Sequence, residues 1–78
     1  MSALKRPIQP MPDAVRTALE ARNLMDAYRA RPPYQRNDWL AWIARAKRSE
    51  TREKRLQSML SELAAGHGYM GMDWTPRS

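Results

Sequence analysis

Two apolar stripes at helical spacing limit the folds open to this chain more than any other feature. They lie between Pro32-Pro33 and Gly66. The first consists of Trp39, Trp42, Ile43 and Ala46, with Leu40 beside it, and the second of Leu56, Met59, Leu60, Leu63 and Ala64. A spacing of i, i+3, i+4 and i+7 places side chains on one face of an amphipathic helix. The stripes predict helices over residues 33–47 and 50–65, with Ser49 as the N-cap of the second helix and Gly66 ending it.

The N-terminal half of the chain predicts two further helices. Pro12 and Asp13 suit a helix start, because proline fits the first turn and an acidic side chain favours the positive helix end. We expect a helix over residues 12–22 and a short one over 24–30, since Asn23 suits a left-handed helix end or an N-cap. A single helix from Pro12 to Ala30 is the alternative. The predicted class is all-α, a small bundle of three longer helices plus one short helix.

The length of 78 residues allows one small domain with a limited core. We expect a flexible N-terminal arm over residues 1–11, a helical domain over 12–66 and a partly ordered C-terminal tail over 67–78. Three prolines at positions 7, 10 and 12 oppose a helix in the arm. The expected core consists of Val15, Leu19, Tyr28, Trp39, Ile43, Leu56, Met59, Leu60 and Leu63.

The charge balance favours acidic partners. The chain has 14 Lys and Arg against 8 Asp and Glu, a net charge of +6. We therefore expect an acidic protein or another anionic partner, and weak non-specific attraction to nucleic acid. The absence of cysteine excludes a disulfide framework and zinc–thiolate sites. No apolar run is long enough for a transmembrane segment. Prolines follow Lys5 and Arg6 where a signal peptide has an apolar stretch, which predicts a cytoplasmic location.

A basic cluster surrounds the expected junction of the last two helices. The predicted site for an anion or acidic partner consists of Arg45, Lys47, Arg48, Thr51, Arg52 and Arg55. Backbone N–H groups at a helix start add to such a site. Two other interpretations stay open. The charges are solvated and pair with neighbouring glutamates, or Thr51 and Arg52 lock the two helices through hydrogen bonds.

The same region has the order of a DNA-binding helix-turn-helix. Residues 39–60 would supply two helices and a short turn, and Arg52 and Arg55 would contact bases. A nucleic-acid-binding protein is therefore the alternative function.

The two tryptophans of the first stripe have two interpretations. As stacking platforms, Trp39 and Trp42 would contact nucleic-acid bases. Their helical spacing with Ile43 favours positions in the core instead. An indole edge at the surface would line a shallow groove with Tyr28 or Tyr34.

No motif predicts catalysis or metal binding. His67 is the one histidine, lies between two glycines, and has neither a cysteine nor a second histidine as a partner. The carboxylates are not paired, and no glycine-rich loop suits a phosphate. We expect a non-catalytic protein with no metal and no cofactor.

The C-terminal residues form a second candidate site, a possible docking tail of Tyr69, Met70, Met72 and Trp74. The alternation of Met70, Met72 and Trp74 predicts an extended segment that lays one side on the domain. These side chains either dock in the groove of a partner or cover the flank of a small core.

The chain also resembles a known family. The residues that carry the resemblance are Trp39-Leu40-Ala41-Trp42-Ile43, Ala46-Lys47, Glu50-Thr51-Arg52-Glu53-Lys54-Arg55, Leu60 and Leu63-Ala64-Ala65-Gly66, preceded by Pro12-Asp13, Ala18-Leu19 and Tyr28. They are similar to the helical module of the bacteriocin-protection, YdeI or OmpD-associated family, over roughly residues 10–67. The resemblance implies a link to bacteriocin or cationic-peptide resistance, no established reaction, and a periplasmic location for some relatives. With the charge pattern, it predicts a non-catalytic interaction module that binds an acidic partner through residues 45–55.

Overall fold

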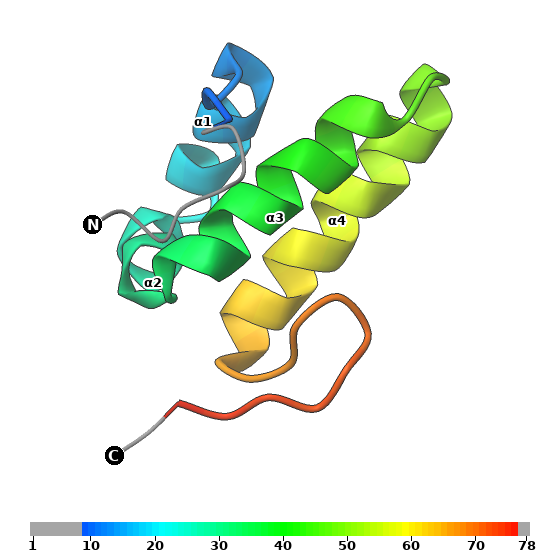
Figure 1. Ribbon diagram of the computed structural model, residues 1–78. Coiled ribbons are helices and arrows are strands. Elements are labelled where there is room, and N and C mark those ends of the chain that lie inside the picture. Colours follow the sequence, from blue (N-terminus) through cyan, green and yellow to red (C-terminus); the bar gives the residue numbers. More distant parts are fainter. Residues whose placement is uncertain (1–8, 77–78) are drawn as a thin grey trace, which may run out of the picture.

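The computed structural model describes residues 9–76, and this part of the chain is built from helices (Figure 1). The helices are α1 (Asp13–Ala21), α2 (Met25–Ala30), α3 (Pro33–Arg45) and α4 (Ser49–Ala65). The predicted all-α class and the order of three longer helices and one short helix are confirmed. Most of the predicted N-terminal arm lies outside the described residues.

The break between α1 and α2 is at Asn23, as predicted. Asn23 has a φ of +57°, in the left-handed region that asparagine tolerates better than most residues. The N–H of Leu24 then reaches back to the carbonyl of Leu19 at 2.8 Å and closes the end of α1. The alternative of one continuous helix to Ala30 is wrong.

The start of α4 differs from the prediction by one residue. Arg48, with an extended backbone, is the N-cap, and its carbonyl accepts a hydrogen bond from the N–H of Arg52 at 3.0 Å. Ser49 is already helical, and no side chain caps this end. The predicted stop is confirmed, because Gly66 closes α4 with a φ of +80°, which glycine adopts without steric cost.

The core lies where α3 and α4 run side by side in opposite directions, with α1 and α2 packed beside them (Figure 1). Every residue of the predicted core is buried, and Trp39, Leu19, Met59 and Leu60 are the most enclosed apolar side chains. Leu40, Ala46 and Tyr69 add to this core. Trp39 is therefore a core residue, as its helical spacing indicated.

Two buried polar side chains were not predicted. Gln35 is 0% exposed and Arg31 is 5% exposed. The carbonyl oxygen of the Gln35 side chain accepts a hydrogen bond from Arg31 at 3.1 Å, and its amide donates to the Tyr34 hydroxyl at 3.1 Å. Buried polar groups need such partners, because an unpaired one costs about 1–3 kcal/mol.

The segment after α4 turns back instead of running extended. Met70 and Gly71 have φ values of +49° and +82°, as in the central positions of a type I′ turn. Tyr69 and Met72 pair across the turn, with both N–H···O distances at 2.9 Å. The prediction of an extended segment is therefore wrong. Met72 points to solvent and is 57% exposed, while Tyr69 is buried and Trp74 half-buried.

Candidate functional site

Two arginines of the predicted basic site donate hydrogen bonds to backbone carbonyls at or just after the end of α3. Arg52 Nη1 donates to the carbonyls of Ala46 and Lys47, at 3.0 and 3.3 Å. Arg55 Nη1 donates to the carbonyl of Trp42 at 2.6 Å. The last carbonyls of a helix have no partner within the helix and carry its negative end, so cations at this place stabilise it. Arg52 thus ties α4 to the segment that directly follows α3, and Arg55 reaches α3 itself.

Arg55 also covers one of the tryptophans. Its guanidinium lies 5.2 Å from the centre of the Trp42 ring, a cation–π contact. Trp42 is half-buried and Trp39 fully buried, so neither ring is a bare stacking platform. Thr51 is the uncharged member of the predicted site, and it is half-buried at the start of α4.

The other cations of the junction remain exposed. We define the junction surface as Arg45, Lys47, Arg48 and Lys54, all of which are exposed. Arg48 lies 3.9 Å from a Glu50 carboxylate oxygen, with side chains 81% and 75% exposed. An ion pair so exposed contributes about 0–1 kcal/mol and leaves the arginine accessible. Arg45 lines a hollow of about 290 Å³ together with Asp38 and Met70.

The arrangement of α3 and α4 differs from a helix-turn-helix. In that motif the two helices cross at about 90–120° and the second presents its first turns to DNA. Here α3 and α4 lie alongside each other as an antiparallel hairpin (Figure 1). The Nη1 groups of Arg52 and Arg55 donate to backbone carbonyls near the end of α3, although Arg52 as a whole is exposed.

Arg31 holds the C-terminal segment against the helices. Its guanidinium donates to the carbonyls of Gly68 at 2.7 Å and Glu62 at 3.0 Å. It also lies over the rings of Trp74 and Trp39, at 4.3 and 5.0 Å from their centres. Burial lowers the pKa of Arg31 and the nearby Glu62 charge raises it. The group nevertheless stays a cation, because arginine keeps its proton in proteins.

The Glu62 carboxylate fixes the turn from the other side. Its two oxygens accept the N–H groups of Met70 and Gly71, each at 2.9 Å. The Tyr69 hydroxyl donates to Asp38 Oδ2 at 2.7 Å. We call Arg31, Asp38 and Glu62 the tail clamp. Of the predicted docking residues, this arrangement leaves Met72 as the exposed one, while Tyr69 packs edge-on against Trp39 with 5.5 Å between ring centres.

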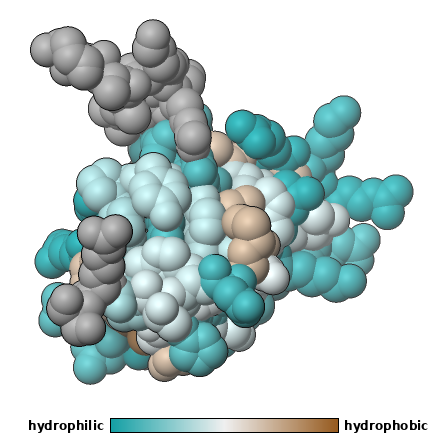
Figure 2. All heavy atoms as spheres, turned by 60° about the horizontal axis from the view of Figure 1, so that its bottom comes forward, coloured by the Kyte–Doolittle hydropathy of each residue, from teal (hydrophilic) through white to brown (hydrophobic). Residues whose placement is uncertain are grey.

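The space-filling view shows the face that the end of the chain covers (Figure 2). Its middle consists of residues of intermediate hydropathy, and strongly hydrophilic side chains project around the edge. Among the described residues, the exposed large hydrophobic side chains are Tyr34 and Met72. The tail therefore covers apolar surface more than it presents any.

A groove borders α3 on the side of α2. It has a volume of about 490 Å³ and is lined by Gln9, Tyr28, Pro33, Tyr34, Arg36, Asn37 and Leu40. The sequence anticipated a groove with one of these tyrosines and an indole edge. The structure has both tyrosines, but neither Trp39 nor Trp42 lines the groove.

Within residues 9–76, no group of three or more His, Asp or Glu side chains is arranged to hold a metal ion. Over the same span, none of the helices has both the length and the apolar character needed to cross a membrane.

Comparison with known proteins found one family. The family model described as bacteriocin-protection, YdeI or OmpD-associated matches residues 10–66. This range contains all four helices and ends where Gly66 closes α4. No curated protein and no solved structure matches the chain.

Proposed function

Because the chain belongs to the bacteriocin-protection, YdeI or OmpD-associated family, we propose that it is a non-catalytic interaction module of this type, which binds an acidic partner through its junction surface. A role in protection against bacteriocins is the cellular setting that the family description supports, and resistance to other cationic peptides is part of the same proposal.

The observation that carries this proposal is the net positive charge that remains at the junction after two of its arginines have bonded to backbone carbonyls. Arg52 and Arg55 donate hydrogen bonds to backbone carbonyls and keep their positive charges, and within residues 9–76 neither forms an ion pair with a carboxylate. Residues 45–55 hold six basic and two acidic side chains, so a net charge of +4 remains at one end of the helical hairpin. Clustered charge of one sign attracts the opposite sign and raises association rates.

The nearby glutamates reduce this charge little. Glu50 makes a long, exposed contact with Arg48. Glu53 accepts a hydrogen bond from the side chain of Gln57 at 2.8 Å, one turn further along α4. The exposed cations of the junction surface are therefore available to a carboxylate-rich partner.

The experiment is a binding titration with polyglutamate as the probe, at about 0.15 M salt, where weak long-range attraction is screened. The variant K47Q/R48Q removes two exposed cations of the junction surface. Its matched control, R16Q/R29Q, removes the same charge from exposed positions on α1 and α2. Arg52 and Arg55 are left unchanged, because their replacement would also loosen the end of α3.

We expect K47Q/R48Q to weaken polyglutamate binding about tenfold and the control less than about twofold, since only the former lies at the site. An equal loss of polyglutamate affinity in both variants would show that the interaction depends on the overall charge of the protein and not on the junction surface. Tighter, sequence-dependent binding of short duplex DNA at the same salt would favour the nucleic-acid alternative.

A further inference from the structure

The groove beside α3 combines an apolar wall with one kind of charge. Tyr28, Tyr34, Pro33 and Leu40 form most of its lining. Arg36 is its charged residue, and the lining contains no carboxylate. A volume of about 490 Å³ falls within the range of small-molecule sites, about 300–1,000 Å³.

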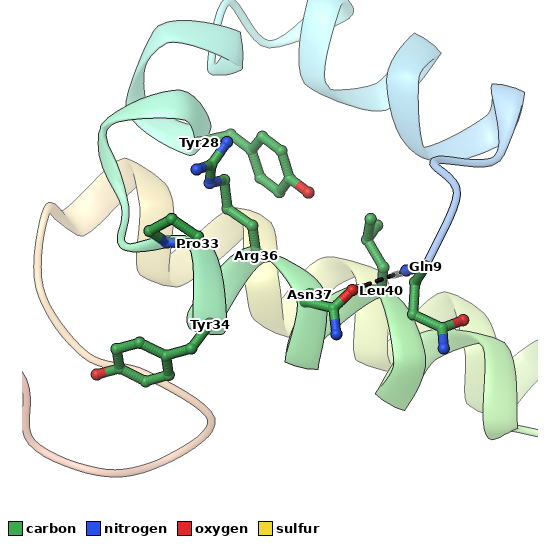
Figure 3. A pocket seen from close by; sticks show the side chains of 7 residues that line it. All are labelled: Gln9, Tyr28, Pro33, Tyr34, Arg36, Asn37 and Leu40. Atoms are coloured by element: carbon green, nitrogen blue, oxygen red, sulfur yellow. Dashed lines mark hydrogen bonds between the residues drawn. The ribbon is translucent and has the colours of Figure 1, made fainter. Parts of the chain in front are cut away.

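The groove follows from the way α3 uses its faces. Gln35, Trp39 and Ile43 lie at i, i+4 and i+8 and face the core. The neighbouring face carries Pro33, Arg36, Asn37 and Leu40, at i, i+3, i+4 and i+7, and borders the groove. Figure 3 shows Arg36 extending from α3 toward Tyr28 of α2, while the Tyr34 ring points the other way.

Arg36 has an unused hydrogen-bond donor at this place. Its Nε is shielded from water and has no hydrogen-bond partner among the described residues. This buried atom is out of reach of a ligand, so the groove offers an anion the positive charge of the guanidinium, which is only partly buried as a whole. A carboxylate suits a guanidinium best, because the pair forms charge-assisted hydrogen bonds.

Tyr28 does not oppose an anion. Burial raises its pKa, and the positive charge of Arg36 opposes that rise. The hydroxyl is therefore neutral at ordinary pH and repels no anion. Asn37 has its carbonyl oxygen occupied, because it accepts the backbone N–H of Gln9 at 2.7 Å (Figure 3). This bond fixes the chain before α1 as the far rim of the groove.

We propose that this groove binds a small aromatic carboxylate, whose ring packs against the tyrosine-lined wall and whose carboxylate pairs with Arg36. The aromatic body follows from Tyr34 and Pro33, which are the exposed apolar residues of the lining, with Tyr28 buried behind them. The anionic group follows from the positive charge of Arg36 and from a lining that, among the described residues, holds no acidic side chain. This site is separate from the junction surface and does not depend on the function proposed for it.

The test is an NMR titration of the labelled protein with benzoate as the probe. We expect a Kd of about 1 mM, with shifts confined to the groove residues of α2 and α3 and to Gln9. Benzyl alcohol lacks the charge and acetate lacks the ring, so each is expected to bind about tenfold more weakly than benzoate. Equal shifts from acetate and benzoate would overturn the aromatic part of the proposal.

Two variants and a control separate the groove from general charge. R36Q is expected to weaken benzoate binding about tenfold. R29Q makes the same charge change at an exposed position on α2 and is expected to leave the Kd unchanged. N37D retains an oxygen acceptor for the Gln9 N–H and places a negative charge in the groove, so benzoate binding is expected to be lost.

Three results would overturn the proposal: unaltered benzoate binding in N37D, equal effects of R36Q and R29Q, or no groove shifts in the unmodified protein. Groove shifts that depend on protein concentration without benzoate would also overturn it, because they would identify a second copy of the chain as the occupant.

Discussion

Replacement of Arg31 by methionine tests the tail clamp directly. Arg31 makes three hydrogen bonds, to Gln35 Oε1, to the Gly68 carbonyl and to the Glu62 carbonyl. A hydrogen bond to a charged group contributes about 1.5–3 kcal/mol. Methionine fills the space of the arginine stem but offers no donor.

The net loss is smaller than the sum of the bonds. Removal of the charge relieves its desolvation cost, and the Gly68 carbonyl gains access to water once the tail loosens. We therefore expect Arg31→Met to lower the free energy of unfolding by about 3 kcal/mol. A chain of 78 residues has a total of about 4–12 kcal/mol, so this variant loses a large part of its stability.

The assay is urea unfolding followed by circular dichroism, together with amide hydrogen exchange of residues 68–72. Arg31→Lys retains the charge without the planar fork, so we expect a loss of about 1.5 kcal/mol. Arg29→Met is the control, because Arg29 is exposed on the same helix and its change is expected within about 0.5 kcal/mol. If Arg31→Met matched Arg29→Met in stability and in exchange at Gly68 and Tyr69, the reasoning would be refuted.

Three further outcomes follow from the structure. Glu62→Gln should speed hydrogen exchange at Met70 and Gly71 and cost about 1–2 kcal/mol, because a side-chain amide accepts through one oxygen where the carboxylate uses two; unchanged exchange would contradict this. Gly66→Ala should lower the free energy of unfolding in urea by about 1 kcal/mol, because a φ of +80° disfavours alanine. The added carbon would meet nothing within 4 Å, so a neutral result would argue against the left-handed cap. Stability should fall as the pH rises above about 10, because burial raises the pKa of Tyr28 and the unfolded chain loses that proton first. The sign follows because fewer protons bound to the unfolded chain mean a negative slope of stability with pH, and Tyr28→Phe should make the fall shallower.

The helices were predictable because their signals are local. A spacing of three and four residues identifies a buried face, and Asn23 and Gly66 end helices through backbone conformations that few other residues adopt. The cap of α4 was misplaced because serine at position 49 suits a cap only if the preceding backbone leaves it outside the helix. Here Arg48 takes that place.

The tail clamp was not predictable from local pattern. Local pattern gives Arg31 no role beyond its place before Pro32-Pro33, yet its partners Glu62 and Gly68 lie 31 and 37 residues along the chain. One signal was present. Gln35 lies four residues before Trp39 on the core stripe, and a polar residue at such a position must find a buried partner.

The junction of α3 and α4 falls within the basic segment 45–55, but the sequence does not tell which of its arginines bond to the backbone and which stay exposed. Arg52 and Arg55 differ from Arg48 in their hydrogen bonds to backbone carbonyls at or just after the end of α3, and such bonds depend on how α4 is placed against α3. Residue type and spacing do not determine that placement.

The family match ends before the packed structure does. This difference affects what must accompany the helices when they are joined to another protein. The match stops at Gly66, whereas the Gly68 carbonyl, the Tyr69 ring and the Trp74 ring complete the surroundings of Arg31 and the core. A recombination that joined a new partner at Gly66 would transfer a buried cation without two of its contacts. Lineages that exchange this module among proteins are therefore expected to carry an equivalent of the tail along with it, or to replace Arg31.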